Sequence, residues 1–502
     1  MNTVRVSSMR SKTGAVDYEG VFPSRERQGR ERDAQIEMWP SSKSKPLDDE
    51  TGTASQELKQ QASTGSALLT NDENRILRSG HTLSFCGLFL FSIVLYLRPY
   101  ELFPALSGFK TMAFYTGLVT LIIFAITQLM IEGNLTARPR EVNLALLLGV
   151  AAIFSIPLAI NPGEAWTGFS ELFVKALLIF IVIVNVVRTE RRLHWLILLA
   201  LGVSIYLSFN AIQDYQAGIF KIGKIENNNL RIAGRIRGLF ENSNDLAMHL
   251  VTMAPIAFTL AFAKRGLIAK IIFLSSTALM VAAIVVTFSR GGFLGLLAVA
   301  FVLVRKMGRN NRVTATAGLV LAIALFIAFA PGDYAGRVST IFDSGADLTG
   351  SSSQRNQVLQ RSVIVALRYP LTGVGLDNFH HRSFQELGTH NAYTQVGSEL
   401  GLAAMVVYMM FLLAPLKRLR DIERESQGNP DDRRFYYLAI GLQGSLIGFM
   451  VSSFFGAVAY QWYVYYLVGY AVCFHRIFLM RSITHQTAGA ESAGFDSPLE
   501  QG

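Results

Sequence analysis

Long apolar stretches dominate the chain from about residue 82 onward, and short polar or charged segments separate them. Most of these stretches approach the ~20 residues that an α-helix needs to cross a ~30 Å hydrocarbon core. A helix satisfies its own backbone hydrogen bonds in lipid, which favours helices over open strands. The pattern predicts an all-α polytopic membrane protein with about twelve transmembrane helices, at 82–98, 112–131, 144–160, 170–187, 195–213, 245–263, 267–287, 292–304, 314–330, 395–415, 435–455 and 460–478.

Polar segments flank this apolar region at both ends. Residues 1–81 are rich in Ser, Gln, Glu and Arg and show almost no apolar periodicity, so we expect a disordered cytoplasmic tail. The tail lacks the short apolar core of a secretory signal peptide. We therefore divide the chain into this tail, a membrane domain at 82–480 and a cytoplasmic C-terminal tail at 481–502.

Basic residues between the apolar stretches fall mainly on one side of the alternating helices. Lysine and arginine concentrate in the cytoplasmic loops of membrane proteins, so this side and both termini are predicted to be cytoplasmic. The opposite short connections, at 161–169, 288–291 and 456–459, contain one basic residue between them. The residues that set the orientation are Arg138, Arg140, Arg188, Arg191, Arg192, Lys264, Arg265, Arg305, Lys306, Arg309, Arg312, Lys417, Arg418, Arg420, Arg424, Arg433, Arg434, Arg476 and Arg481.

Two long segments, 214–244 and 331–394, remain on the outer side of the membrane in this arrangement. Loops of such length are usually functional or disordered. The second segment contains a stretch from Arg355 to Arg368 in which apolar and polar residues alternate at helical spacing. We expect an amphipathic helix that lies at the membrane interface there.

Composition agrees with this picture. Hydrophobic residues make up 51% of the chain and charged residues 16%, where a soluble protein carries roughly 25% charged residues. The formal net charge of +10 is explained by loop residues that fix topology, so no nucleic-acid binding is predicted. Cys86 and Cys473 lie in apolar stretches, and no Cys or His pair has zinc-ligand spacing, so no disulfide, metal site or other cofactor is predicted.

The first group of candidate site residues leads from the outer segment into the sixth predicted helix. Arg235 and Arg237 stand there among Asn and Gly residues, on the side that positive charge normally avoids. Arginine presents a planar fork of donors suited to phosphate or carboxylate. Asn242 and Asn244 accompany the two arginines. Interfacial anchoring is the alternative role for the arginines, and Asn244 or Asp245 is a candidate helix cap.

The second group is the tight outer turn Ser289-Arg290-Gly291-Gly292, which apolar stretches bound on both sides. Glycines permit sharp turns and the close approach of other groups. A single arginine at a membrane boundary can extend its side chain to the lipid headgroups. Because the short outer connections at 161–169 and 456–459 contain no basic residue, we favour a functional role for Arg290.

The third group begins the tenth predicted helix. Asn391, Gln395 and Glu399 are spaced four residues apart and form one polar stripe on a helix. Uncharged polar residues often serve only as contacts between helices, whereas an acid inside the membrane is a functional candidate. His390 precedes the stripe and is suited to act as a general base near neutral pH. Arg355, on the outer amphipathic helix, faces either lipid headgroups or the same site.

These residues resemble the O-antigen ligase and polymerase superfamily. The resemblance lies in the SRGG turn, in R-G-x-F-x-N-x-N-D from Arg237, and in H-N-x-Y-x-Q-x-x-x-E-x-G from His390. The stretch PLTGVGLDNF at 370–379 is similar to a segment that precedes the histidine in many members. Each motif is short, but their order, spacing and topology agree over residues 82–480.

The resemblance implies a GT-C-like membrane fold with a long periplasmic loop between helices 9 and 10. It also implies a metal-independent, inverting glycosyltransferase in the bacterial inner membrane, with its active site facing the periplasm. The donor would be a glycan linked to undecaprenyl diphosphate, and the acceptor a glycan or lipid A core. By this analogy Arg237 and Arg290 hold the diphosphate and His390 activates the acceptor hydroxyl. Substrate-binding roles are expected for Arg235, Asn242, Asn244, Arg355, Asn391, Gln395 and Glu399.

Other functions stay open from the sequence. A secondary transporter also fits twelve helices with both ends in the cytoplasm, with Glu399 as a coupling residue. Neither an internal repeat nor a group of polar residues near the membrane midplane supports it. A scaffold role rests only on the N-terminal tail. Within the superfamily, ligation, polymerisation and protein glycosylation are not distinguished, and the partners common to all are membrane lipids, the lipid-linked donor and its acceptor.

Overall fold

The computed structural model describes residues 80–102, 104–109, 111–219, 221–222, 230–232, 240, 242–308, 313, 317, 320 and 351–495. Nearly all of the predicted tail at 1–81 lies outside these residues, as do Arg235, Arg237 and most of the apolar stretch 314–330.

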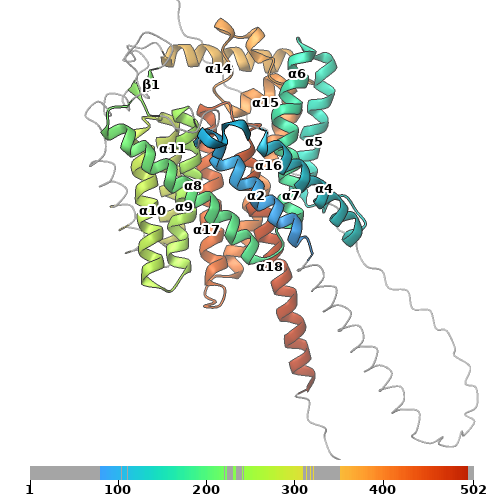
Figure 1. Cartoon of the computed structure of the whole chain (residues 1–502), viewed down its shortest axis with the longest axis vertical. Coiled ribbons are helices and arrows are strands. Elements are labelled where there is room, and N and C mark those ends of the chain that lie inside the picture. Colours follow the sequence, from blue (N-terminus) through green and yellow to red (C-terminus); the bar gives the residue numbers. More distant parts are fainter. Residues whose placement is uncertain are drawn as a thin grey trace, which may run out of the picture. The chain divides into compact units, whose positions relative to one another are not determined.

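The described chain is almost entirely helical (Figure 1). Its longer helices are α2 (Thr82–Leu97), α4 (Met112–Glu132), α5 (Arg140–Ser155), α7 (Val174–Val186), α8 (Glu190–Gln216), α9 (Ser243–Ala263), α10 (Leu267–Val286), α11 (Arg290–Met307), α14 (Ser351–Arg368), α15 (Ala392–Leu400), α16 (Leu402–Glu425), α17 (Arg433–Ser452) and α18 (Trp462–Phe495). Shorter turns are α3 (Pro99–Leu102), η1 (Pro104–Phe109), η2 (Ile156–Leu158), α6 (Pro162–Gly168), η3 (Phe169–Phe173), η5 (Phe379–Arg382), η6 (Phe384–Glu386) and η7 (Ser453–Phe455). Within the described residues one short antiparallel pair of strands joins β1 (Lys221–Ile222) to β2 (Leu230–Arg231).

Ten of the described helical segments are long and apolar enough to cross a membrane. This finding confirms a polytopic helical membrane protein. α11 is not among the ten; it has 18 residues and carries Arg290 at one end and Arg305 and Lys306 at the other. Because the stretch 314–330 is also largely outside the described residues, the count of twelve and the cytoplasmic termini stay predictions.

The predicted connection at 161–169 is wrong, because most of it is the helix α6. The side chain of Asn161 caps this helix by accepting the backbone N–H groups of Gly163 and Glu164, and Pro162 occupies the first turn. Both features are ordinary signals of a helix start. α6 continues through the π-helical turn η3 into α7, so Pro162–Val186 forms a single candidate span.

The predicted helix at 395–415 is two helices, because the chain breaks at Gly401. Gly401 has φ 92° and ψ 167°, a conformation that side-chain-bearing residues rarely adopt. α15 ends before this glycine and α16 begins after it. Glu399 therefore lies on a short buried helix outside the candidate spans, and not two turns inside a continuous transmembrane helix.

The long outer segment 331–394 is described from residue 351, where α14 begins. α14 contains the amphipathic helix predicted at 355–368. Val358 on this helix is buried, whereas Ile364 and Leu367 expose 53% and 65% of their surface. An apolar face of this kind suits the membrane interface predicted for it.

α9 lies at the centre of the membrane domain and is buried along most of its length. It packs against α8, α10, α11 and α17. Small residues on α17 permit close contacts with α9: an added Cβ at Gly441 would lie 2.2 Å from the Thr259 side chain, and one at Gly448 would lie 2.9 Å from Val251. Close backbone approach at small residues is typical of helices that pack in lipid.

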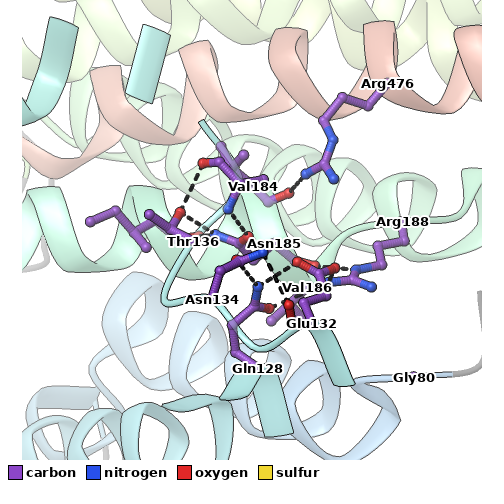
Figure 2. Close-up of polar contacts among 12 residues, drawn as sticks. Gly80, Gln128, Glu132, Asn134, Thr136, Val184, Asn185, Val186, Arg188 and Arg476 are labelled. Carbon is purple, nitrogen blue, oxygen red and sulfur yellow. Dashed lines mark hydrogen bonds and ion pairs between the residues drawn. The ribbon is translucent and has the colours of Figure 1, made fainter. Parts of the chain in front are cut away.

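A buried polar network closes the end of the domain where α4 and α7 end and α8 begins (Figure 2). Arg188 is 5% exposed, pairs with Glu132 and donates to the Gln128 side chain. Asn185 accepts the Ala137 N–H at 2.8 Å and donates to Thr136 at 2.8 Å.

Arg192, at the same end, donates to the Gly80 and Val186 carbonyl oxygens at 2.9 and 3.0 Å. Arg188 and Arg192 therefore serve buried contacts in addition to any effect on topology. We call this end, which also carries Lys264 and Arg434, the basic end.

Candidate functional site

The start of α11 places Arg290 at the first helical position of a tightly held turn. Ser289 caps the helix, since its Oγ accepts the Gly292 N–H at 3.1 Å, and Arg290 is half-buried. A Cβ added at Gly292 would lie 2.6 Å from Ala247, and one at Gly291 would lie 2.7 Å from Phe455. The two glycines therefore allow close packing of this turn on neighbouring helices.

The start of α9 is hydrogen-bonded to the same turn. Ser289 Oγ donates to Asn244 Oδ1 at 2.8 Å, which joins the second sequence motif to the first. Asn242 caps α9 by accepting the Asn244 N–H at 3.0 Å. The cap is thus Asn242 and not Asn244 or Asp245, because the helix begins at Ser243. Asn242 is exposed and Asn244 is half-buried.

The 3-10 turn η7 links the start of α11 to the start of α15. Phe455 packs against Gly291, while Phe454 contacts the ring of Tyr393 with centroids 4.6 Å apart. Ser452 at the end of α17 donates to the Gly291 carbonyl oxygen at 3.1 Å. Tyr393 in turn donates to the Met450 carbonyl oxygen at 2.8 Å. We call this region, where α9, α11 and α15 begin and α17 ends, the polar end.

The predicted polar stripe on α15 points into the protein. Asn391 caps the helix: its Oδ1 accepts the N–H groups of Tyr393 and Thr394 at 2.9 and 3.1 Å. Gln395 is buried, and its Oε1 accepts the Ala459 N–H at 3.3 Å. His390, the residue before the cap, is exposed. The described contacts of Asn391 and Gln395 therefore hold α15 in place beneath the exposed His390.

The stretch 370–378 folds over the end of α15 and fixes Glu399. The N–H groups of Val374 and Gly375 donate to the carbonyl oxygens of Ser398 and Glu399 at 2.9 and 3.0 Å. Gly373 has φ +65°, and a Cβ there would lie 2.2 Å from the Glu399 carbonyl carbon. Glycine is thus needed at position 373, where the backbone of this stretch touches the backbone of α15. This contact explains a glycine in the PLTGVGLDNF motif.

Glu399 itself is 4% exposed, and its Oε2 has no hydrogen-bond partner among the described residues. Burial raises the pKa of this carboxyl to about 8, and the Asp377 carboxylate adds to the shift. The Asp377 backbone N–H and the Tyr460 hydroxyl oppose it. The carboxyl is therefore mostly protonated at neutral pH.

Residues 275–409 match the family model of the O-antigen ligases. The chain contains an O-antigen ligase domain. This finding confirms the resemblance to the ligase and polymerase superfamily for this part of the chain, and the ten apolar helices agree with a multi-pass membrane protein. No curated protein matches the chain significantly.

The O-antigen ligase domain runs from within α10 into α16 and includes Arg290, Arg355, His390 and Glu399. Asn242 and Asn244 precede the matched segment, but Asn244 contacts Ser289 inside it. Arg355 is half-buried on α14, and α14 packs against α15. No comparison tests the roles of these residues, which stay predictions.

A cavity of about 390 Å³ lies at the basic end. Its lining includes Arg191, His194, Lys264 and Arg434, and none of the residues predicted for the site. The predicted site of the O-antigen ligase domain is therefore at the other end of α9 from this cavity.

Sequence reasoning missed one polar cluster, which joins α6 to the O-antigen ligase domain. Glu164 of α6 lies against His380 and His381 of η5. The sequence separation of 217 residues between Glu164 and His381 hides this contact, and neither the motifs nor helical spacing indicate it. Two adjacent histidines were the one available signal.

Proposed function

We propose that the O-antigen ligase domain transfers a glycan from a polyprenyl-diphosphate-linked donor to an acceptor hydroxyl at the polar end, which faces the periplasm. Arg290 and Arg237 hold the donor diphosphate. His390 accepts the proton of the attacking hydroxyl. The bond between the anomeric carbon and the diphosphate oxygen breaks as the new glycosidic bond forms on the opposite face, so the configuration inverts.

The observation that carries this proposal is the meeting of three motif-bearing helix starts around η7. Ser289 Oγ joins α11 to Asn244 of α9, and residues 454–455 contact both α11 and α15. Arg290 and His390 therefore stand on elements that share one support, as a binding group and a base for one substrate require.

Arg290 suits a diphosphate for two physical reasons. Its guanidinium forms paired, charge-assisted hydrogen bonds with phosphate oxygens. It also stands at the N-terminus of an 18-residue helix, where the helix dipole favours a bound anion. Fixed cations stabilise the charge that develops on a departing diphosphate, so no metal ion is required for this step.

His390 suits the role of base because its ring is exposed next to a fixed helix cap. The capping hydrogen bonds of Asn391 hold the backbone on which His390 stands. Imidazole is the side chain that most often serves as a general base in enzymes. We assign Asn391, Gln395 and Glu399 to positioning of this helix, and Asn242, Asn244, Arg235 and Arg355 to donor contacts.

The proposal is tested in cells that lack the native gene. Plasmids supply wild-type protein, Arg290→Ala or His390→Ala, and surface polysaccharide is compared with the amount of each protein in the membrane. Both variants are expected to lose the polysaccharide while they accumulate normally. Arg368→Ala, which removes an exposed arginine at the end of α14, is the matched control and should retain it.

Normal polysaccharide in both variants would refute the assignment of the site. The alternative function, secondary transport, predicts instead that protein in proteoliposomes takes up a solute in the absence of any lipid-linked glycan.

A further inference from the structure

Three side chains with metal-binding groups meet between α6 and η5. Glu164 Oε2 lies 2.7 Å from His381 Nε2 and 3.5 Å from His380 Nε2. The two imidazole rings lie together, with centroids 4.0 Å apart. One nitrogen or oxygen atom from each residue falls within 4.8 Å of the others.

A hydrogen bond to Glu164 explains the position of the His381 ring, but not that of the His380 ring. The 2.7 Å contact between His381 and Glu164 is an ordinary hydrogen bond. At 3.5 Å, His380 Nε2 is beyond the usual range for such a bond to the same oxygen. Zinc bonds of about 2.1 Å in a tetrahedron separate neighbouring ligand atoms by about 3.4 Å, which is close to this second distance.

We propose that Glu164, His380 and His381 bind one divalent transition-metal ion and that this ion fastens the loop ahead of His390 to α6. The donor set is two imidazoles and a carboxylate, which suits zinc. Two of its three donors are imidazole nitrogens, which do not suit calcium or magnesium, since those ions take oxygen ligands almost exclusively.

The surrounding backbone holds the ligands in place before any ion binds. Asn378 Oδ1 accepts the Asn161 N–H at 2.6 Å, and the Ile160 N–H donates to the Val374 carbonyl oxygen at 3.1 Å. Gly168 lets α6 approach the loop closely: an added Cβ would lie 2.6 Å from the Leu376 side chain. Ligands on such a fixed frame bind a metal with little ordering cost.

Charge and access also favour an ion at this position. The side chains of Glu164, His380 and His381 are 42%, 30% and 30% exposed, so an ion can enter from solvent. The Asp377 carboxyl lies close enough to interact electrostatically with both His380 and Glu164. Three protein ligands leave a fourth tetrahedral position for water.

The test measures Zn²⁺ binding by the full-length protein in detergent, purified through a tag without histidine and stripped with a chelator. Isothermal titration with Zn²⁺ is expected to show one site per chain. Glu164→Gln, His380→Gln and His381→Gln should each weaken that site about 10-fold or more. Zn²⁺ should also raise the thermal midpoint of the wild-type protein and not of these variants.

Glu386→Gln is the matched control, because it removes an exposed carboxylate from the same loop and should bind Zn²⁺ as the wild type does. Glu164→Gln keeps the size of the side chain, so size-exclusion profiles should match those of the wild type. The proposal fails if the wild-type protein binds no Zn²⁺, or if all three ligand variants bind it equally well. Neither readout depends on glycan transfer.

Discussion

Arg290 stands where its positive charge adds to the positive end of a helix dipole. Such a position favours a bound anion, and a diphosphate would interact with both the guanidinium and the helix dipole. The sequence alone singles out this residue, because the short outer connections at 161–169 and 456–459 contain no basic residue. The close packing of Gly291 and Gly292 on Phe455 and Ala247 depends on distant residues and is visible only in the structure.

Glu399 has a protonation behaviour that can be measured directly. Its pKa is about 8 in the folded protein and near 4.5 as an ordinary glutamate, so the folded state holds the proton more tightly. The free energy of unfolding should therefore fall by up to about 1.4 kcal/mol per pH unit between pH 4.5 and 8 through this group. Glu399→Gln removes the titration and should gain stability relative to the wild type over that range.

The measurement is the thermal midpoint of both proteins in detergent from pH 5 to 8. The gap between Glu399→Gln and wild type should widen steadily as the pH rises. Glu386→Gln, an exposed acid, should show no such trend. A constant gap at every pH would mean that Glu399 titrates normally.

Among the elements, the break between α15 and α16 decides the form of the polar end. The apolar periodicity of 395–415 is continuous, because Val396, Leu400 and Val407 follow helical spacing across the break. Periodicity alone therefore predicts one helix. The glycines at 373, 375 and 401 mark the break and the segment that packs on it, since each has a positive φ where two backbone segments meet.

Gly373→Ala tests this contact. A Cβ at this position would lie 2.2 Å from the Glu399 carbonyl carbon, and the positive φ adds conformational strain. We expect a loss of several kcal/mol in stability, on the order of an overpacked and strained site. The readout is a lower thermal midpoint and less protein in the membrane.

Gly388→Ala is the control for that variant, because no heavy atom lies within 4 Å of its added Cβ and its φ is not positive. Equal thermal midpoints for Gly373→Ala and Gly388→Ala would contradict the proposed docking of residues 370–378 on α15.

At the scale of the whole membrane domain, the proposed site and the basic cavity lie at opposite ends of α9. Three motif-bearing helix starts meet at the polar end, while Arg191, Lys264 and Arg434 line the cavity at the basic end. The apolar pattern predicted most of the spanning helices, because lipid requires long uninterrupted apolar segments. From the sequence, Arg188 and Arg192 are assigned only to membrane orientation, through the concentration of basic residues in cytoplasmic loops. Both are also buried and hold neighbouring helices together, which that rule does not predict.

The most direct test of the account is glycan transfer by the purified full-length protein. The protein is mixed in detergent with a polyprenyl-diphosphate-linked oligosaccharide and a panel of glycan and lipid A core acceptors, and the products are separated and analysed by mass spectrometry. The wild type is expected to form a new glycosidic linkage. Arg290→Ala and His390→Ala should slow it by on the order of 100-fold or more, and Arg368→Ala should not. Transfer at the wild-type rate by both Arg290→Ala and His390→Ala would contradict the account.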